Sequence, residues 1–460
     1  MRVVMTAFAL WMATAAATAA ELERETLAPD NGWAAFGAGT TGGALAADDH
    51  VYTVTTRREF IAALNDGVPS STSPANPSNL SKIIRVQGTI DFNVDDSNQP
   101  LACENYFRAD PTTGQLFSYE AFAAAFDPNG AWGRVNPSGP QERARVASAA
   151  AQQARVRIRP GSNTTIVGVG KDATLKGIWL DIRGTANVAN SRTSIIVRNL
   201  SFVDTYDCFP QWAPTDGALG SWNALYDSIS LRDSNNVWVD HNRFEDVATA
   251  DDTLPLRFGV VFQVHDGLLD ITNASDLVTV SWNVFRDHDK VMLIGSSDNA
   301  PADVGKLRVT LHHNLFDDLG QRGPRVRFGQ VHIYNNYYKI CSTPGYAYSL
   351  GVGIQSQIYA EENFFLVDPS AIPLARVIAR FNGANIHEAG SLVGSVPRPA
   401  SASHYVDLVA EYNAVNDPDL IPTVGWAPTL FTNLHNAHAV PPRVTQQAGP
   451  AFSVQSLGCR

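Results

Sequence analysis

The sequence predicts an all-β fold, a parallel β-helix in which each turn of the chain stacks on the turn before it. Two observations lead to this prediction. Five strand-like stretches carry alternating apolar residues and then continue with Asn, one further residue, and Phe or Tyr. Their asparagines recur at irregular intervals of 41, 31, 22 and 27 residues, which is typical of solenoid coils separated by loops of variable length. The stretches are NVWVDHNRFED (236–246), LVTVSWNVFRD (277–287), LRVTLHHNLFDD (307–318), GQVHIYNNYYK (329–339) and QSQIYAEENFF (355–365).

The recurring asparagines give this prediction its physical basis. In a β-helix each coil lays its strand on the previous coil, so equivalent positions stack at the spacing of neighbouring strands. Val, Ile, Leu and Phe then fill the inward positions, and stacked Asn side chains can hydrogen-bond as a ladder at the turns. A β-sandwich is the alternative, but sandwiches lack a repeated Asn-x-Phe pattern. The ladder is expected at Asn242, Asn283, Asn314, Asn336 and Asn363.

The first 20 residues are typical of a secretory signal peptide. They carry one Arg, an apolar run over 3–12 and an Ala17-Thr18-Ala19 pattern, so cleavage is expected after Ala19 or Ala20. A membrane anchor is the alternative, but the apolar run is shorter than the ~20 residues that a span needs. We therefore expect a secreted, extracellular protein with no membrane partner.

The remaining residues, 21–460, are expected to form a single β-helix domain with loop excursions. Between about residues 104 and 155 the segments FSYEAFAAAF and ERARVASAAAQQARV are rich in Ala and favour helix, which predicts a helical insertion between coils. An elongated monomer is the default expectation. Earlier coils are predicted at KIIRVQGTIDF (82–92), NTTIVGVG (163–170), SIIVRNLSFVD (194–204) and DSISLRD (227–233).

Charge and cysteine content limit the function further. The net charge of −11 argues against a nucleic-acid partner, because phosphate binding needs a dominant basic surface. An anionic substrate must therefore be held by a local positive site. Four cysteines in an exported chain indicate two disulfides rather than a zinc site. The pairs nearest along the chain are Cys103 with Cys208 and Cys341 with Cys459, although two other connectivities remain open.

Acidic and basic side chains gather between residues 265 and 338. HDGLLD (265–270) contains two aspartates four residues apart, DHDKVMLIG (287–295) contains a lone lysine, and RGPRVR (322–327) contains three arginines. Carboxylate oxygens are the ligands that a hard cation such as calcium requires. Guanidinium groups suit the carboxylates of a substrate. Together these motifs predict an enzyme that acts on an acidic polymer.

The chain resembles the pectate lyases of polysaccharide lyase family 1 over most of residues 30–440. The resemblance is carried, in order, by YDSISL, VWVDHNRF, HDGLLD, HDKVMLIG, LRVTLHHNLF and RGPRVRFGQVHIYNNYY. It implies a right-handed β-helix and a secreted enzyme that cleaves α-1,4-linked polygalacturonate (pectate) by calcium-dependent β-elimination. The expected products are 4,5-unsaturated oligogalacturonides.

The resemblance also implies roles for individual residues. Asp227, Asp266 and Asp270 would be the calcium ligands. Without the resemblance, Asp266 and Asp270 would be interpreted as solvated turn residues, and Asp227 could be a strand-edge residue that faces solvent.

Three basic residues complete the site that the resemblance implies. Lys290 and Arg327 would bind substrate carboxylates, and Arg322 would remove the proton from the substrate. Arginine is an unusual base because its guanidinium stays protonated in nearly all settings, although crowding by other positive groups favours the neutral form. Strand alternation places Arg325 and Arg327 on one face, so spacing does not select Arg322 over Arg325.

Three other functions fit the sequence less well. A pectin lyase would act on methyl-esterified chains without calcium and typically lacks the three aspartates. A polygalacturonase would need a Gly-His-Gly element that is absent from the sequence. A non-catalytic β-helix that only binds polysaccharide would not need all three basic residues beside a calcium site.

Overall fold

The computed structural model describes most of the chain. The predicted signal peptide, Cys341 and Cys459 lie outside the described residues, as does the disulfide predicted between those two cysteines. No helix in the described ranges is long and apolar enough to cross a membrane. These ranges are 22–184, 192–250, 253–340, 345–368, 370–395 and 403–450.

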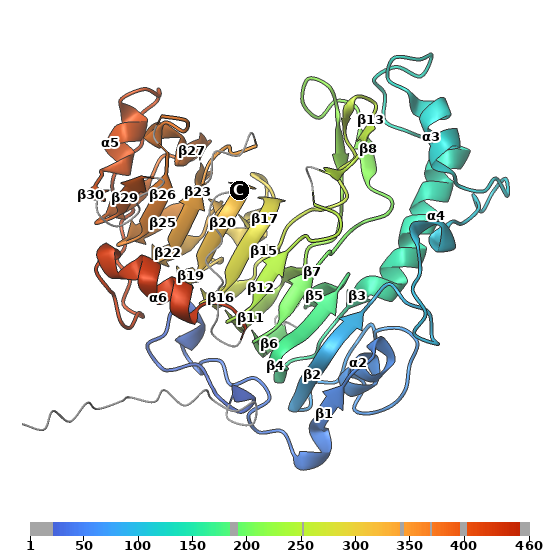
Figure 1. The fold of residues 1–460 in the computed structure, drawn as a ribbon, viewed down its shortest axis with the longest axis horizontal. Helices are drawn as coiled ribbons and strands as arrows, with labels where there is room; N and C mark the ends of the chain where they lie inside the picture. The colour runs from blue at the N-terminus through green and yellow to red at the C-terminus, as the bar shows by residue number, and fades with distance from the viewer. Residues whose placement is uncertain are drawn as a thin grey trace, which may run out of the picture.

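The chain winds through three columns of parallel strands, and each complete coil contributes one strand to each column (Figure 1). The first column is β1(Val51–Val54), β2(Lys82–Asp91), β4(Thr164–Lys176), β6(Arg192–Arg198), β11(Ser234–Asp240), β16(Asp276–Ser281), β19(Val309–His312), β22(Gln330–Tyr334), β25(Gln357–Glu361) and β28(Ile386–Ala389). The second column begins on the end of β4 and is β7(Ser201–Val203), β12(Arg243–Glu245), β17(Val284–Lys290), β20(Leu315–Gln321), β23(Tyr337–Ile340), β26(Phe364–Val367) and β29(Leu392–Ser395).

The third column is a separate eight-stranded sheet. Its members are β3(Arg157–Ile158), β5(Trp179–Arg183), β10(Ile229–Arg232), β15(Leu269–Thr272), β18(Leu293–Ile294), β21(Arg325–Val326), β24(Leu350–Gly353) and β27(Ile378–Phe381). Because every pair within the three columns is parallel, a β-sandwich of antiparallel strands is excluded. The fold is a right-handed parallel β-helix, as predicted, and the earlier coils also lie where the sequence placed them.

The five repeated asparagines form the predicted ladder. All five are completely buried. In each step the side-chain oxygen of one Asn accepts hydrogen bonds from the backbone N–H and the side-chain amide of the Asn one coil earlier. The oxygen of Asn283, for example, lies 2.9 Å from the backbone N and 3.0 Å from Nδ2 of Asn242. The same pair of bonds recurs from Asn283 to Asn314, from Asn314 to Asn336 and from Asn336 to Asn363.

The residue before each ladder asparagine turns the coil. These five residues have left-handed backbone conformations with φ between 50° and 55°, a region that non-glycine residues adopt infrequently. The bend ends the first-column strand and directs the next strand into the second column. The residues are His241, Trp282, His313, Asn335 and Glu362.

The aromatic residues of the repeated pattern stack inside the coils. Phe244 and Phe285 have ring centroids 4.9 Å apart with planes inclined by 8°, and the stack continues through Phe316, Tyr338 and Phe365. Near-parallel rings at this spacing fill the interior between successive strands. The Asn-x-Phe pattern therefore encodes two adjacent ladders, one polar and one aromatic.

Helices and loops extend the β-helix at several points. The expected helical insertion contains α3(Tyr119–Phe126) and α4(Pro140–Val156), which stand away from the coils in Figure 1. Beside them stand two hairpins, β8(Gln211–Ala213) with β9(Ser221–Asn223) and β13(Leu256–Arg257) with β14(Val260–Val261). The predicted Cys103–Cys208 disulfide is present and ties the insertion to the loop that leads to β8. Shorter elements are α2(Arg57–Leu64), α5(Leu408–Asn413), α6(Val440–Gln447) and β30(His404–Tyr405).

Removing one member from the middle of the Asn ladder should destabilise the protein strongly. Asn283→Ala leaves the buried backbone N–H and side-chain amide of Asn242 without their acceptor, and each unpaired buried group costs about 1–3 kcal/mol. We expect the free energy of unfolding to fall by about 3 kcal/mol or more, measured by urea denaturation.

Asn129→Ala provides the matched control, because Asn129 is exposed in the loop after α3. A change below about 0.5 kcal/mol in both variants would mean that the ladder contributes little to the alignment of the coils.

Candidate active site

The predicted site residues lie at one bend of the β-helix, where the chain passes from the second column to the third. Backbone hydrogen bonds connect this bend on four successive coils. Ser228 N donates to Gly267 O at 3.2 Å, Leu269 N to Val291 O at 3.0 Å, and Met292 N to Arg322 O at 2.9 Å. Because stacked coils are about 4.8 Å apart, residues distant in sequence become neighbours here.

Asp227 and Asp270 converge on Gly267. Asp227 is buried; its Oδ1 accepts a hydrogen bond from Gly267 N at 2.9 Å and its Oδ2 accepts one from the Ser230 hydroxyl. Asp270 Oδ1 accepts from Leu293 N at 2.9 Å. A Cβ at position 267 would lie 2.9 Å from Asp227 Oδ1 and 2.7 Å from Asp270 Oδ1. Only glycine therefore allows the two carboxylates to approach each other this closely.

The aspartates repel one another electrostatically. Burial, then the charges of Asp270 and Asp266, raise the pKa of Asp227 well above its ordinary value. Burial and the charge of Asp266 raise the pKa of Asp270 to about 7, while Arg322 acts in the opposite direction. Three carboxylates are thus close enough to disfavour one another's charge. A divalent cation would relieve this repulsion.

The donor set suits a hard cation such as calcium, since it consists of carboxylate oxygens. Asp227 and Asp270 are turned toward each other, whereas Asp266 is half-buried and precedes the strand β15. With the side chains in these positions, no group of three or more His, Cys, Asp or Glu residues in the described part of the chain could surround a metal ion unaided. Asp227 and Asp270 form the preformed part of the predicted site, and Asp266 would have to turn toward them.

The structure distinguishes the three arginines of RGPRVR. Arg327 is buried and engaged: its Nε lies 2.6 Å from Asp298 Oδ1 and its Nη1 donates to Gly295 O at 2.8 Å. Asp298 also accepts a hydrogen bond from Asn382 at 2.8 Å, so this carboxylate is itself held in place. Arg327 is therefore fixed in one orientation.

Arg325 and Arg322 face different surroundings. The Arg325 guanidinium lies 4.0 Å from the centroid of the Phe381 ring. Burial, followed by the charge of Arg327, lowers the pKa of Arg325. Arg322 has a left-handed backbone with φ of 63°, which interrupts the alternation expected from the sequence, and its charge acts on Asp270. The charge of Arg322 thus acts on both Asp270 and Tyr348, whereas Arg325 stacks on the aromatic ring of Phe381.

Lys290 lies between the aspartates and Arg322 in the order of the coils. It ends β17, pairs with Gln321 on the following coil and forms a bridge with Gly267 on the preceding one. Lys290 is half-buried and makes no ion pair with any residue in the described ranges. Its ammonium group is available for an external carboxylate.

The residues that support this site could not be predicted from the sequence. Asp298 and Asn382 hold Arg327, and His288 lies between Asp246 (Nδ1 to Oδ2, 2.5 Å) and the carbonyl oxygen of Asp266 (Nε2 to O, 3.0 Å). These partners are 22 to 84 residues apart along the chain. No local pattern signals such pairs.

The fold and the site define the class of protein. Carboxylates for a hard cation and free basic groups for anionic sugars lie at one bend of a parallel β-helix, an arrangement suited to a polysaccharide lyase. Comparison with known proteins specifies the family. A family model described as pectate lyase matches residues 136–415. The chain belongs to the pectate lyase family and is a polysaccharide lyase.

Individual relatives cover nearly the whole chain. A pectate lyase of Bacillus subtilis (strain 168) is 39% identical over 448 residues, spanning 96% of this chain and 97% of the relative. Pectate lyase E of Dickeya dadantii (strain 3937) is 34% identical over 393 residues, spanning 84% and 80%. Among solved structures, the thermostable pectate lyase PL 47 superposes with a TM-score of 0.86 at 44% identity, covering 94% of this chain and 99% of that one. A pectate lyase bound to a hexasaccharide superposes with a TM-score of 0.83 at 36% identity, covering 94% and 100%.

The raised pKa of Asp270 predicts how stability depends on pH in a chelator. Between about pH 4 and pH 7 the folded protein keeps a proton that the unfolded chain has released, so the free energy of unfolding should fall as pH rises through this window. Asp270→Asn removes the charge and should be more stable than wild type by roughly 2–4 kcal/mol at about pH 8, with little difference at about pH 4. Urea denaturation at both pH values measures this.

Asp216→Asn, at an exposed position on the loop between β8 and β9, is the control for loss of one negative charge. If Asp216→Asn matched Asp270→Asn at high pH, the gain would reflect net charge alone and the local repulsion argument would be wrong.

Proposed function

We propose that this pectate lyase is secreted and cleaves α-1,4-linked polygalacturonate by calcium-dependent β-elimination, which releases 4,5-unsaturated oligogalacturonides. The observation that supports it most directly is the alignment of Asp227, Asp270, Lys290 and Arg322 at one bend of successive coils. A relative whose structure holds a hexasaccharide supports an extended sugar chain as the substrate. Residues 21–460 would form one catalytic domain that acts as a monomer.

The cation would be held by Asp227, Asp266 and Asp270, whose oxygen donors and mutual repulsion fit it. When bound, calcium would draw electron density from the uronate carboxylate and so make the adjacent C5 proton more acidic. Lys290 and Arg327 would hold substrate carboxylates. Lys290 would do so with its ammonium group, which is unpaired among the described residues, and Arg327 with Nη2, the guanidinium nitrogen that makes neither the bond to Asp298 nor the bond to Gly295.

Arg322 would remove the C5 proton. The electron pair of the broken C5–H bond then forms the C4–C5 double bond, the C4–O bond breaks, and the leaving oxygen takes up a proton. No water is consumed. The Arg322 Nε atom is buried without a hydrogen-bond partner among the described residues.

Absorbance near 235 nm, the signal expected of an unsaturated uronate, tests the proposed reaction. We expect a steady rise with polygalacturonate and calcium, a rate at least about 100-fold lower after chelation, and little rise with highly methylated pectin. A faster rise on methylated pectin without calcium would identify a pectin lyase instead. No rise on either substrate would refute the proposed reaction.

Two conservative variants test the assignment of the base. Arg322→Lys should lower kcat on polygalacturonate by about 100-fold or more at alkaline pH, because general-base catalysis typically contributes 10²–10⁴-fold. Arg325→Lys should keep most of the activity, since its contact is with Phe381. If Arg322→Lys stayed active at saturating substrate while Arg325→Lys did not, the base would have to be reassigned to Arg325.

A further inference from the structure

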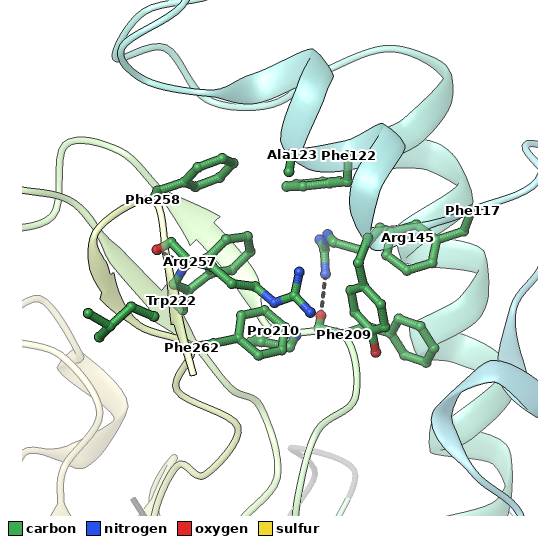
Figure 2. A pocket seen from close by; sticks show the side chains of 12 residues that line it. Phe117, Phe122, Ala123, Arg145, Phe209, Pro210, Trp222, Arg257, Phe258 and Phe262 are labelled. Atoms are coloured by element: carbon green, nitrogen blue, oxygen red, sulfur yellow. Dashed lines mark hydrogen bonds between the residues drawn. The ribbon is translucent and has the colours of Figure 1, made fainter. Parts of the chain in front are cut away.

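A cavity of about 240 Å³ lies between the helical insertion and the two hairpins (Figure 2). Its walls are aromatic. Trp222 and Phe258 stack with centroids 5.3 Å apart and planes inclined by 15°, and Phe262 meets Trp222 edge to face at 4.9 Å. Phe122 and Tyr119 contribute the opposite side from the insertion. The cavity therefore lies where two parts of the chain meet that are also joined by the Cys103–Cys208 disulfide.

Arg257 places a positive charge inside this aromatic cavity. Its guanidinium lies 4.6 Å from the ring centroids of both Tyr119 and Phe262, and Figure 2 shows it reaching toward the centre of the cavity. Its buried Nε has no hydrogen-bond partner, and no carboxylate of the described chain pairs with it. The neighbouring Arg145, by contrast, is satisfied by Glu142 and by the Phe209 carbonyl oxygen.

The hairpin that carries Arg257 has an unfavourable backbone conformation at its turn. Phe258 and Gly259 form its two-residue turn, with φ of 56° and 79°, so a bulky aromatic residue occupies a left-handed position that Gly or Asn would occupy more easily. This conformation stacks the Phe258 ring on Trp222. The tip of the hairpin is thus shaped as a wall of the cavity.

We propose that this cavity is an outlying binding subsite for one uronate residue of the polysaccharide. The apolar C–H face of a sugar ring packs on aromatic rings, and the planar guanidinium of Arg257 binds a carboxylate through two parallel hydrogen bonds. This combination selects an acidic sugar over a neutral one. The proposal deepens the proposed function, since it concerns the same class of substrate.

The position of the cavity relative to the candidate active site supports this occupant. Trp222 lies five residues before Asp227, and Phe262 lies four residues before Asp266. Even fully extended, these links span at most about 18 Å and about 14 Å. A sugar chain that crosses the catalytic bend can therefore reach the cavity, and its occupation would steady the two loops that lead into the aspartates.

Equilibrium binding of trigalacturonate in the presence of a chelator, measured by calorimetry, tests the subsite without turnover. We expect Arg257→Gln to weaken binding by about three- to tenfold, the effect of losing a charge-assisted hydrogen bond at a partly exposed site. Arg58→Gln, an exposed arginine on α2, removes the same charge elsewhere and should bind as wild type does. Methyl-esterified trigalacturonate should bind weakly to all three proteins.

A thermal unfolding curve and a second variant, Arg257→Lys, show whether weaker binding results from loss of the guanidinium group or from unfolding of the protein. Arg257→Lys keeps the charge and should recover part of the affinity. Equal trigalacturonate affinity in wild type and Arg257→Gln would overturn the proposal. So would a cavity that binds an aromatic carboxylate, 4-hydroxycinnamate, but does not bind trigalacturonate. The lyase assay is independent: an inactive wild type whose affinity still depends on Arg257 would refute the proposed reaction and support the subsite.

Discussion

The stacking of coils is the constraint on which the rest of this structure depends. The Asn ladder fixes the height of each coil, because every step pairs a side-chain oxygen with two donors of the coil before it. The left-handed residue before each Asn fixes where the coil bends. Loops of very different length can then leave the stack and return to it without disturbing the register. The alignment of residues 227, 267, 290 and 322 follows from this one regularity.

The candidate active site contains both negative and positive side chains whose charges are not neutralised by neighbouring residues. Burial and the charges of neighbouring aspartates raise the pKa values of Asp227 and Asp270, and Lys290 lacks an ion-pair partner within the described ranges. Such an arrangement costs stability in the free protein. It is reasonable in a site that receives a divalent cation and an anionic polymer, because both reduce the cost on binding. Arg327, which is already paired with Asp298, forms the fixed part of this arrangement.

The loops outside the coils have a second organisation of their own. Aromatic side chains from the insertion and from the hairpins form a separate apolar cluster, joined by the Cys103–Cys208 disulfide. This cluster holds in place the segments that lead to Asp227 and Asp266. The insertion therefore has a structural role, because it supports the loops that position Asp227 and Asp266.

The repeated Asn-x-Phe pattern was sufficient to predict the β-helix, its ladder and the order of its coils, because each coil repeats the same local chemistry. HDGLLD and RGPRVR were sufficient to locate the candidate site. The sequence could not show whether Arg322 or Arg325 is the base, since the alternation of side chains along a strand does not hold where Arg322 adopts a left-handed backbone. It also could not show that Asp298 holds Arg327, or that Arg257 lies unpaired among aromatic rings. Those relations join residues from different coils and loops, so they arise only when folding brings them together.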